Sequence, residues 1–308
     1  APVRARLEEL YASRETLAPL VESVLQEMVA VTVAELGFTT GGQPIPPVMY
    51  HSTPLPWALI VSPRDRIDQE ANISLATSLT VEDHIRIEDQ ISETLGYSTL
   101  VVPVGGVGTY PTMVAQTTNL NWLAEVVSHE WIHNYLTLRP LGIRYDQSPE
   151  LRTINETTAN LAGDEIGAAL IAEFFPEFVP PPAPPPPAGE EDQPQLESQP
   201  PVFDFRAEMH ETRVTVDQLL GEGKIAEAEQ YMETRRQFFW DNGYQIRKLN
   251  QAYFAFYGAY ADQPIGSAGE DPVGAAVRAL RAQSGSLIEF VREVARVKSF
   301  EQLQNLVE

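Results

Sequence analysis

Cysteine is absent from the 308 residues of this chain. The absence excludes disulfide bonds, thiol nucleophiles and thiolate metal ligands, so any catalysis or metal binding must use oxygen and nitrogen groups. A chain without cysteine is compatible with a cytoplasm, a bacterial envelope or a hot habitat. Cysteine usage therefore narrows the chemistry of the protein and leaves its compartment open.

A long apolar segment is also missing. No uninterrupted run reaches the roughly 18 apolar residues that a membrane-spanning helix needs, and the first residues lack a signal-peptide pattern. The chain begins with Ala1 and not with methionine, which raises the hypothesis of a removed leader or a membrane anchor outside the given residues. Two locations remain open, namely the bacterial cell envelope and the cytoplasm.

Basic residues are scarce. Lysine and arginine number 21 against 43 aspartates and glutamates, which gives a formal net charge of −22. Such a surface repels nucleic acid, so we expect no nucleic-acid partner. With 43% hydrophobic residues, the chain is long enough to bury a substantial core. We expect a folded, bilobed unit.

Histidine is rare too, but two of the five histidines stand four positions apart in the run His-Glu-Trp-Ile-His at 129–133. Residues at positions i and i+4 share one face of a helix, so both imidazoles can bind one metal ion. A helix is indicated from Asn121 to Leu138, because apolar residues recur every three or four positions and Pro140 follows. Glu130 can then take a proton from a water molecule that the metal activates.

A second motif narrows the class of metal site. The metzincin extension of the first motif fails, since Leu136 and Arg139 occupy the positions of its glycine and third histidine. Further along, the run Asn-Glu-Thr-Thr-Ala-Asn at 155–160 lies in another predicted helix. The two motifs together resemble the gluzincin metallopeptidases, the thermolysin-like and aminopeptidase-like enzymes, whose second helix carries Asn-Glu-x-x-(Ser/Ala)-Asp.

This resemblance implies one zinc ion per chain. The ligands would be His129, His133 and Glu156, and Glu130 would be the general base that deprotonates the attacking water. The residues alone leave the third ligand open, because a surface position is the ordinary alternative for a helical acid. Three other acids of the same helix compete with Glu156 for this role: Glu150, Asp164 and Glu165.

The second helix is predicted from residue 149 to about 175. Gly163 and Gly167 lie one turn apart in it, which indicates a close approach of another helix, most naturally the one that carries the histidines. The family aspartate that orients a zinc-binding histidine is replaced by Asn160, whose carbonyl can accept the same hydrogen bond. Asp164 is the rival for that role.

The remaining patterns predict an α+β fold. By the resemblance, it would be a zincin-like catalytic unit with a mixed-sheet N-terminal lobe, a mainly helical C-terminal lobe and the zinc site in the cleft between them. Within the sheet lobe, strands are expected at 48–50, 58–61 and 99–104, and a capped helix at 80–95. Four regions follow in chain order: a helical lead-in (1–37), the catalytic core (38–175), a proline-rich insertion without fixed fold (176–202) and a helical lobe (203–308).

The run from Tyr110 to Val114 is strand-like and contains Pro111, which favours the edge of a sheet. In gluzincins an edge strand before the active helix pairs with extended substrate, and the resemblance gives that role to this run. An ordinary edge strand is the alternative. The aminopeptidase signature Gly-x-Met-Glu-Asn is absent here, so the acid that grips a peptide's amino terminus is missing.

A zinc hydrolase also needs a donor for the negative charge that develops on the attacked carbonyl oxygen. In gluzincins a tyrosine or histidine of the second lobe supplies it, and by resemblance the candidates are His210, Tyr253 and Tyr257. Core packing is the alternative for the two tyrosines, and a surface position is the alternative for His210.

The sequence therefore predicts a zinc-dependent metallopeptidase that acts on a peptide or protein substrate. Two alternatives stay open. One is a catalytically silent protein of the same fold with a binding or scaffold role, and the other is a zinc hydrolase of non-peptide amides or esters. Cleavage specificity, the choice between endo- and exopeptidase and the oligomeric state are not predicted.

Overall fold

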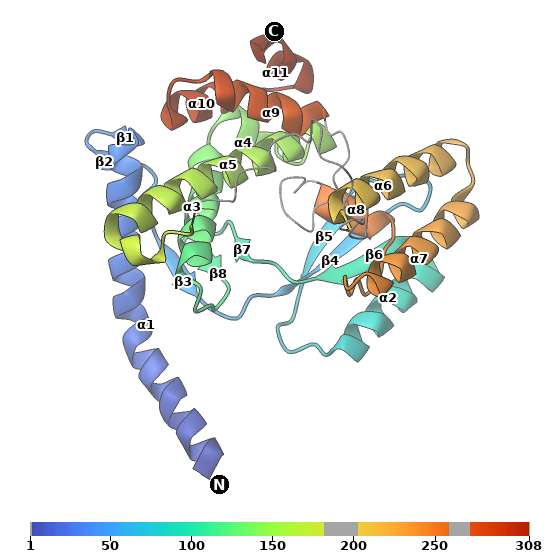
Figure 1. The fold of residues 1–308 in the computed structure, drawn as a ribbon, viewed down its shortest axis with the longest axis horizontal. Helices are drawn as coiled ribbons and strands as arrows, with labels where there is room; N and C mark the ends of the chain where they lie inside the picture. Colours follow the sequence, from blue (N-terminus) through green and yellow to red (C-terminus); the bar gives the residue numbers. More distant parts are fainter. Residues whose placement is uncertain (1, 182–202, 259–271, 308) are drawn as a thin grey trace, which may run out of the picture.

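The structure is a computed structural model in which residues 2–181, 203–258 and 272–307 are described. It is a mixed α/β protein, mainly helical with small sheets, in agreement with the expected α+β class (Figure 1). Most of the predicted proline-rich insertion, residues 182–202, lies outside the described residues.

Helix α1 (Pro2–Glu35) begins the chain and projects from the rest of the molecule (Figure 1). Its last third is packed, since Leu25, Val29 and Val33 are buried in the core. The expectation that no segment is long and apolar enough to cross a membrane needs correction, because the helix Val3–Glu35 contains an 18-residue window that is apolar enough and holds at most two charged residues. This finding concerns length and composition alone.

A first hydrophobic core joins the end of α1 to the motif-bearing helices and the last helices of the chain, and we call this part the helical half. The two predicted motif helices are confirmed, with Asn119 and Ser148 as their N-caps. The helices that follow α1 in this half are α3 (Leu120–Leu136), α4 (Pro140–Ile143), α5 (Pro149–Phe174), the 3-10 turn η1 (Pro176–Phe178), α9 (Pro272–Gln283), α10 (Leu287–Val294) and α11 (Phe300–Val307).

The close approach predicted from two glycines is confirmed between α3 and α5. A Cβ atom at Gly163 would lie 2.9 Å from the Cβ of His129, and one at Gly167 would lie 2.9 Å from the backbone nitrogen of Glu125. Larger residues would push the helices apart. The glycines therefore let α5 lie directly against the helix face that carries the first histidine.

A small sheet in the helical half has the strand order β3-β8-β7. Its strands are β3 (Tyr50–Ser52), β7 (Gly106–Val107) and β8 (Thr112–Val114), and a hairpin of β1 (Thr39–Thr40) and β2 (Gln43–Pro44) follows α1. Strand β8 pairs in parallel with β3 and antiparallel with β7, so the predicted edge position of Tyr110 to Val114 is wrong. Pro111 precedes the paired residues, and the two edge strands are β3 and β7.

The second core lies around an antiparallel sheet with the order β5-β4-β6, and we call this part the sheet half. Its elements are β4 (Trp57–Ser62), β5 (Ala71–Leu75), α2 (Val81–Leu95), β6 (Ser98–Val102), α6 (Phe205–Gly221), α7 (Ile225–Asp241) and α8 (Gln251–Tyr257). Successive strand residues point to opposite faces. Ala58 and Ile60 therefore pack against α6 to α8, and Leu59 and Val61 pack against α2.

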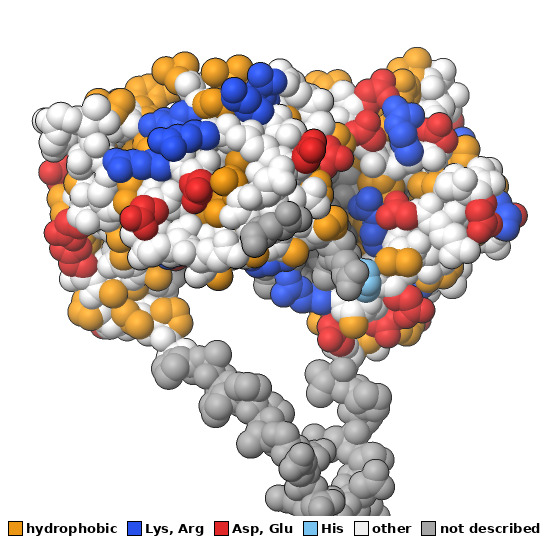
Figure 2. Space-filling view, turned by 90° about the horizontal axis from the view of Figure 1, so that it is seen from above, with side chains coloured by type: hydrophobic (Ala, Val, Ile, Leu, Met, Phe, Trp, Pro, Cys, Tyr) orange, Lys and Arg blue, Asp and Glu red, His pale blue; other side chains and the backbone are white. Residues whose placement is uncertain are grey.

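The expected helical C-terminal lobe is divided between the two halves. Helices α6 to α8 cover the sheet, whereas α9 to α11 pack against α5 (Figure 1). Helices α3 and α5 belong to one half, so His129 and Glu156 do not face each other from separate lobes as expected. Despite the net negative charge, the face in Figure 2 carries separate groups of basic and acidic side chains.

Candidate metal centre

Three side chains that the sequence singled out converge between α3 and α5. His129, His133 and Glu156 each offer one ligand atom to a cluster that could hold a metal ion. The Nε2 atoms of the histidines are 3.0 Å apart, and Oε2 of Glu156 lies 3.7 Å from the first and 3.5 Å from the second. Ligands of a tetrahedral zinc ion are about 3.3 to 3.6 Å apart. The three separations lie within about 0.3 Å of this range, so the cluster could hold a metal ion of this size.

Two asparagines of α5 orient the histidines. Asn155 Oδ1 accepts a hydrogen bond from Nδ1 of His133 at 2.8 Å, and the side chain of Asn160 hydrogen-bonds His129. A histidine whose Nδ1 donates in this way directs Nε2 toward a metal. Asp164, the rival of Asn160, interacts instead with Glu125.

The electrostatics of the cluster favour one positive charge at its centre. Burial lowers the pKa of His133, but attraction to Glu156 outweighs burial and the net pKa is raised. Burial raises the pKa of Glu156, yet the two histidines bring it well below its usual range. Burial and the neighbouring imidazole both lower the pKa of His129. Either a proton on His133 or a metal ion can supply the favoured charge, and a metal would release that proton.

Glu130 lies beside the cluster and is not one of its three ligands. Its side chain is buried, and burial raises its pKa to about 7. A Cβ atom at Gly106 would lie 2.3 Å from its Oε1, and one at Gly108 would lie 3.4 Å from its Oε2. The glycine-rich run before α3 therefore brings the backbone of β7 against this carboxylate.

Tyr145 is a site residue that the sequence analysis missed. It follows α4, and its hydroxyl donates a hydrogen bond to Oε1 of Glu156. The other oxygen of Glu156 is buried and has no hydrogen bond within the described residues. No motif marks this tyrosine, because the loop that carries it has no periodic pattern and only tertiary packing brings it to the cluster.

A cleft of about 970 Å³ opens between the two halves at this cluster. Its wall includes Glu130 and all three candidate ligands from the helical half, and Trp57 from the sheet half. Charged groups from other elements, including Glu70 and Asp146, lie along the same wall. The cleft gives a molecule of peptide size access to the cluster.

The three predicted oxyanion donors have different positions. Tyr257 lines the cleft from the end of α8. Tyr253 is buried in the core of the sheet half and does not line the cleft, which corrects its assignment. His210 lies on α6 and is not among the residues of the cleft wall either. Of this set, the structure therefore leaves Tyr257 as the one member that lines the cleft.

Comparison of the chain with protein-family models, curated proteins and solved structures finds no match. The function therefore has to be inferred from the residues and their geometry. What the structure brings together is the His129, His133 and Glu156 cluster, the adjoining Glu130 and the orienting asparagines.

Proposed function

We propose that this chain is a zinc-dependent metallopeptidase of the gluzincin type, with a zincin-like arrangement around α3 and α5. The observation that carries the proposal is the convergence of His129, His133 and Glu156 with the buried Glu130 beside them. Buried polar groups normally satisfy one another, whereas Oε2 of Glu156 has no hydrogen bond within the described residues. Three protein ligands and a place for the reactants are the pattern of catalytic zinc sites.

The residues of the site fit a hydrolytic reaction. A zinc ion held by the three ligands would polarise a peptide carbonyl and lower the pKa of a water molecule to about 7. Glu130 accepts the proton of the attacking water and later donates it to the leaving amine. Its position beside the three candidate ligands, against the backbone of β7, suits both steps.

Strand β7 is the place where we expect the substrate backbone to bind. It is one edge of its sheet, and an extended peptide can add to a sheet edge by backbone hydrogen bonds. Because Gly106 brings β7 against Glu130, a peptide paired there lies beside the general base. We therefore assign to β7 the substrate-pairing role that was expected for the run from Tyr110 to Val114.

Two tyrosines then have separate tasks. Tyr257 lines the cleft from α8, so we assign it the hydrogen bond to the developing negative charge on the carbonyl oxygen. Tyr145 donates to Glu156 and holds that carboxylate in place. Phenylalanine at position 257 should lower kcat while leaving zinc affinity unchanged, and phenylalanine at position 145 should lower zinc affinity.

The decisive test is Glu130→Gln in the full chain. We expect it to abolish hydrolysis of a broad peptide library by the zinc-loaded protein, because the base is lost, while zinc remains bound at one ion per chain. Glu150→Gln is the matched control, since that acid is exposed on the first turn of α5. Retained peptidase activity in the Glu130 variant would refute the assignment. Zinc binding without any turnover by the wild type would favour the silent binding protein instead.

A further inference from the structure

Arg152 is a buried cation in the cleft that has no close partner. Its side chain is 11% exposed, and its single ion pair is a contact of 4.0 Å to Asp146, whose side chain is 85% exposed. Its Nε atom is buried without a hydrogen bond, and no side-chain hydrogen bond of Arg152 occurs within the described part of the chain. The two terminal nitrogens are not among the buried unpaired atoms and lie at the cleft wall, where they can meet a ligand. The surroundings therefore favour an anionic group that comes from outside the chain.

The guanidinium faces the candidate metal centre across one aromatic ring. Arg152 Cζ lies 6.0 Å from the ring centroid of Tyr145, and that ring lies 6.2 Å from the ring of His133. Arg152 and Glu156 are one helical turn apart on α5, and both line the cleft. An extended peptide advances about 3.3 to 3.6 Å per residue. The two distances place the guanidinium no more than about 12 Å from the His133 ring. One or two residues, together with the scissile carbonyl and the contact between carboxylate and guanidinium, can fill that span.

We propose that Arg152 binds the C-terminal carboxylate of a peptide and makes the enzyme a carboxypeptidase that releases one or two residues. This inference rests on the proposed peptidase function for its catalytic part. A guanidinium matches the two oxygens of a carboxylate with two parallel hydrogen bonds. Other charged groups along the cleft wall, such as Glu70 and Asp146, are acidic, so a ligand with several negative charges would be repelled. A single carboxylate is the anion that fits.

The sequence is consistent with cleavage near the C-terminal end of a peptide. The aminopeptidase signature that provides an acid for a free amino terminus is absent before α3. An arginine near the centre provides the opposite charge, which selects the opposite end of a peptide. Arg152 therefore accounts for the proposed preference for a peptide terminus and for the choice of the C-terminus.

The test compares two pools of N-acetylated tripeptides with the same randomised side chains, one with free carboxylates and one with C-terminal amides. Binding to the zinc-supplied Glu130→Gln protein is measured by affinity selection and mass spectrometry. We expect the acids to bind about tenfold to hundredfold more tightly, because hydrogen bonds to a charged group are lost in the amides. Arg152→Gln should remove this preference, and Arg152→Lys should keep part of it.

Arg144→Gln is the matched control, because Arg144 lies in the same loop region, hydrogen-bonds Gln147 and does not line the cleft. Equal binding of the two pools, or a preference that survives Arg152→Gln in a protein with a native unfolding curve, would overturn the inference. A preference for acids without any hydrolysis by the wild type would refute the peptidase proposal and leave the carboxylate site standing. Equal cleavage of both pools by the wild type would support the peptidase proposal and refute the carboxylate site.

A second, independent observation concerns the projecting part of α1. Apolar residues recur there at alternating steps of four and three residues and are 45% or more exposed: Val3, Leu7, Leu10, Leu17, Val21 and Val24. Arg14 occupies the one remaining position of this series, and Met28 and Val31 continue it toward the body. A 3.5-residue repeat is the pattern of a two-stranded coiled coil, in which a single polar residue on the seam can fix the register.

We infer that two copies of the chain pair through this seam. In a second copy the same residues form the same seam, so a two-fold axis can place the two seams in contact. The apolar seam residues from Val3 to Val24 stay exposed, and Arg14 is the seam position that contacts the body within the described residues, through a hydrogen bond to Oε1 of Gln116. A membrane is the other apolar partner to be considered for this helix, and the experiment below distinguishes it from a second copy.

The test is the molar mass of the full chain in solution, measured by sedimentation equilibrium between about 1 and 100 µM. We expect a dimer for the wild type and a monomer for the double variant Leu10→Glu and Leu17→Glu. The matched control places glutamate at Val81 and Val214, which are 54% and 52% exposed on α2 and α6. A monomeric wild type would overturn the inference, and so would a dimer that survives the seam variant. A monomer that floats with lipid vesicles would assign the seam to a membrane.

Discussion

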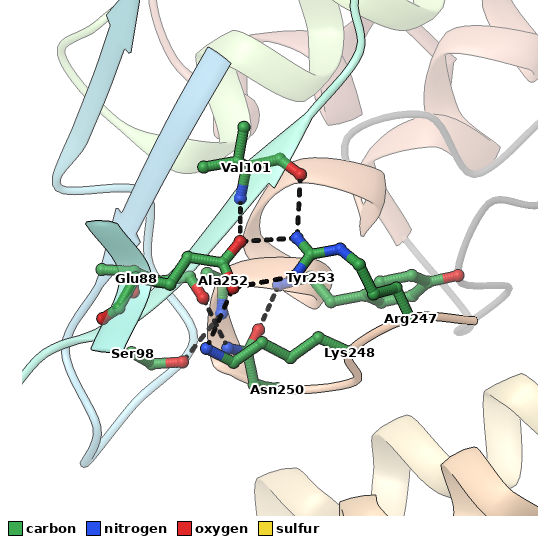
Figure 3. Close-up of polar contacts among 9 residues, drawn as sticks. Glu88, Ser98, Val101, Arg247, Lys248, Asn250, Ala252 and Tyr253 are labelled. Atoms are coloured by element: carbon green, nitrogen blue, oxygen red, sulfur yellow. Dashed lines mark hydrogen bonds and ion pairs between the residues drawn. The ribbon is translucent and has the colours of Figure 1, made fainter. Parts of the chain in front are cut away.

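The two halves of the molecule each bury a glutamate, and the two carboxylates have opposite surroundings. In the sheet half, Glu88 accepts hydrogen bonds from the backbone of Val101 and from both terminal nitrogens of Arg247, and lies 3.3 Å from Nζ of Lys248 (Figure 3). In the helical half, one oxygen of Glu156 accepts a hydrogen bond from Tyr145 and the other has none within the described residues.

This difference separates a carboxylate that serves the fold from one that is available to a ligand. Burial raises the pKa of Glu88, but its hydrogen bonds and the two nearby cations outweigh burial, so the net pKa is lowered. The cations belong to the chain and stay in place. The charge that balances Glu156 lies on two imidazoles that a metal ion can also bind. We therefore expect loss of Glu88 to damage stability and loss of Glu156 to damage metal binding.

The largest effect should follow Glu88→Ala. Removing one member of a fully buried ion pair costs about 3 to 5 kcal/mol of unfolding free energy, and because Arg247 is 33% exposed we expect a loss toward the lower end of that range. Urea unfolding measures this loss. Glu233→Ala is the control, because Glu233 pairs with Arg236 while 64% exposed, and such pairs are worth about 0 to 1 kcal/mol. Similar losses in both variants would contradict the structural role of Glu88.

Glu156→Gln should show the opposite pattern. It removes a proposed zinc ligand, so we expect zinc affinity to fall by more than about hundredfold, which exceeds the usual effect of residues that only orient a ligand. The unfolding free energy should fall less than in Glu88→Ala, since His133 can release its proton when Glu156 is lost, whereas Arg247 and Lys248 stay charged. Competition with a chromogenic zinc chelator gives the affinity. Wild-type zinc binding in this variant would remove Glu156 from the site.

The sequence predicts the elements of the candidate site better than their surroundings. The helices α3 and α5 follow from local periodicity and caps, and the contact between them follows from Gly163 and Gly167. The central position of β8 in its sheet could not be predicted from the sequence. Its partner β3 lies about 60 residues earlier, and a local sequence pattern does not show which distant strands pair.

Two further features depend on packing between distant parts of the chain. Tyr145 reaches Glu156 from a loop without a pattern, and Arg247 meets Glu88 although the two residues are 159 positions apart. The division of the C-terminal helices between two cores has the same origin. An amphipathic helix specifies that one face is buried and does not specify which core receives it.

A smaller effect on metal binding should follow Asn155→Ala. The variant removes the acceptor for Nδ1 of His133, which normally costs tenfold to hundredfold in metal affinity. Asn160→Ala should act similarly through His129. Asn121→Ala serves as the control, because that side chain donates to the backbone of Phe178 and lies outside the cluster. Unchanged zinc affinity in both site variants would show that the asparagines do not orient the ligands.

The smallest effect concerns how the unfolding free energy that Glu88 contributes changes at low pH. Its folded pKa is below the ordinary value, so the unfolded state binds more protons in the window between the folded pKa and about 4.3. Stability from this group is therefore complete above the window and is lost as the pH falls through the folded pKa. The slope is at most about 1.4 kcal/mol per pH unit for one proton.

The Glu88→Gln variant should lack this slope, so the stability advantage of the wild type over the variant should shrink as the pH falls, measured by urea unfolding at successive pH values below 5. The variant keeps the shape of the side chain, so what it changes is the charge that Arg247 and Lys248 neutralise. If the two proteins lose stability in parallel as the pH falls, Glu88 is not held ionised by its partners. The contrast with Glu156 would then rest on hydrogen-bond geometry alone and not on charge.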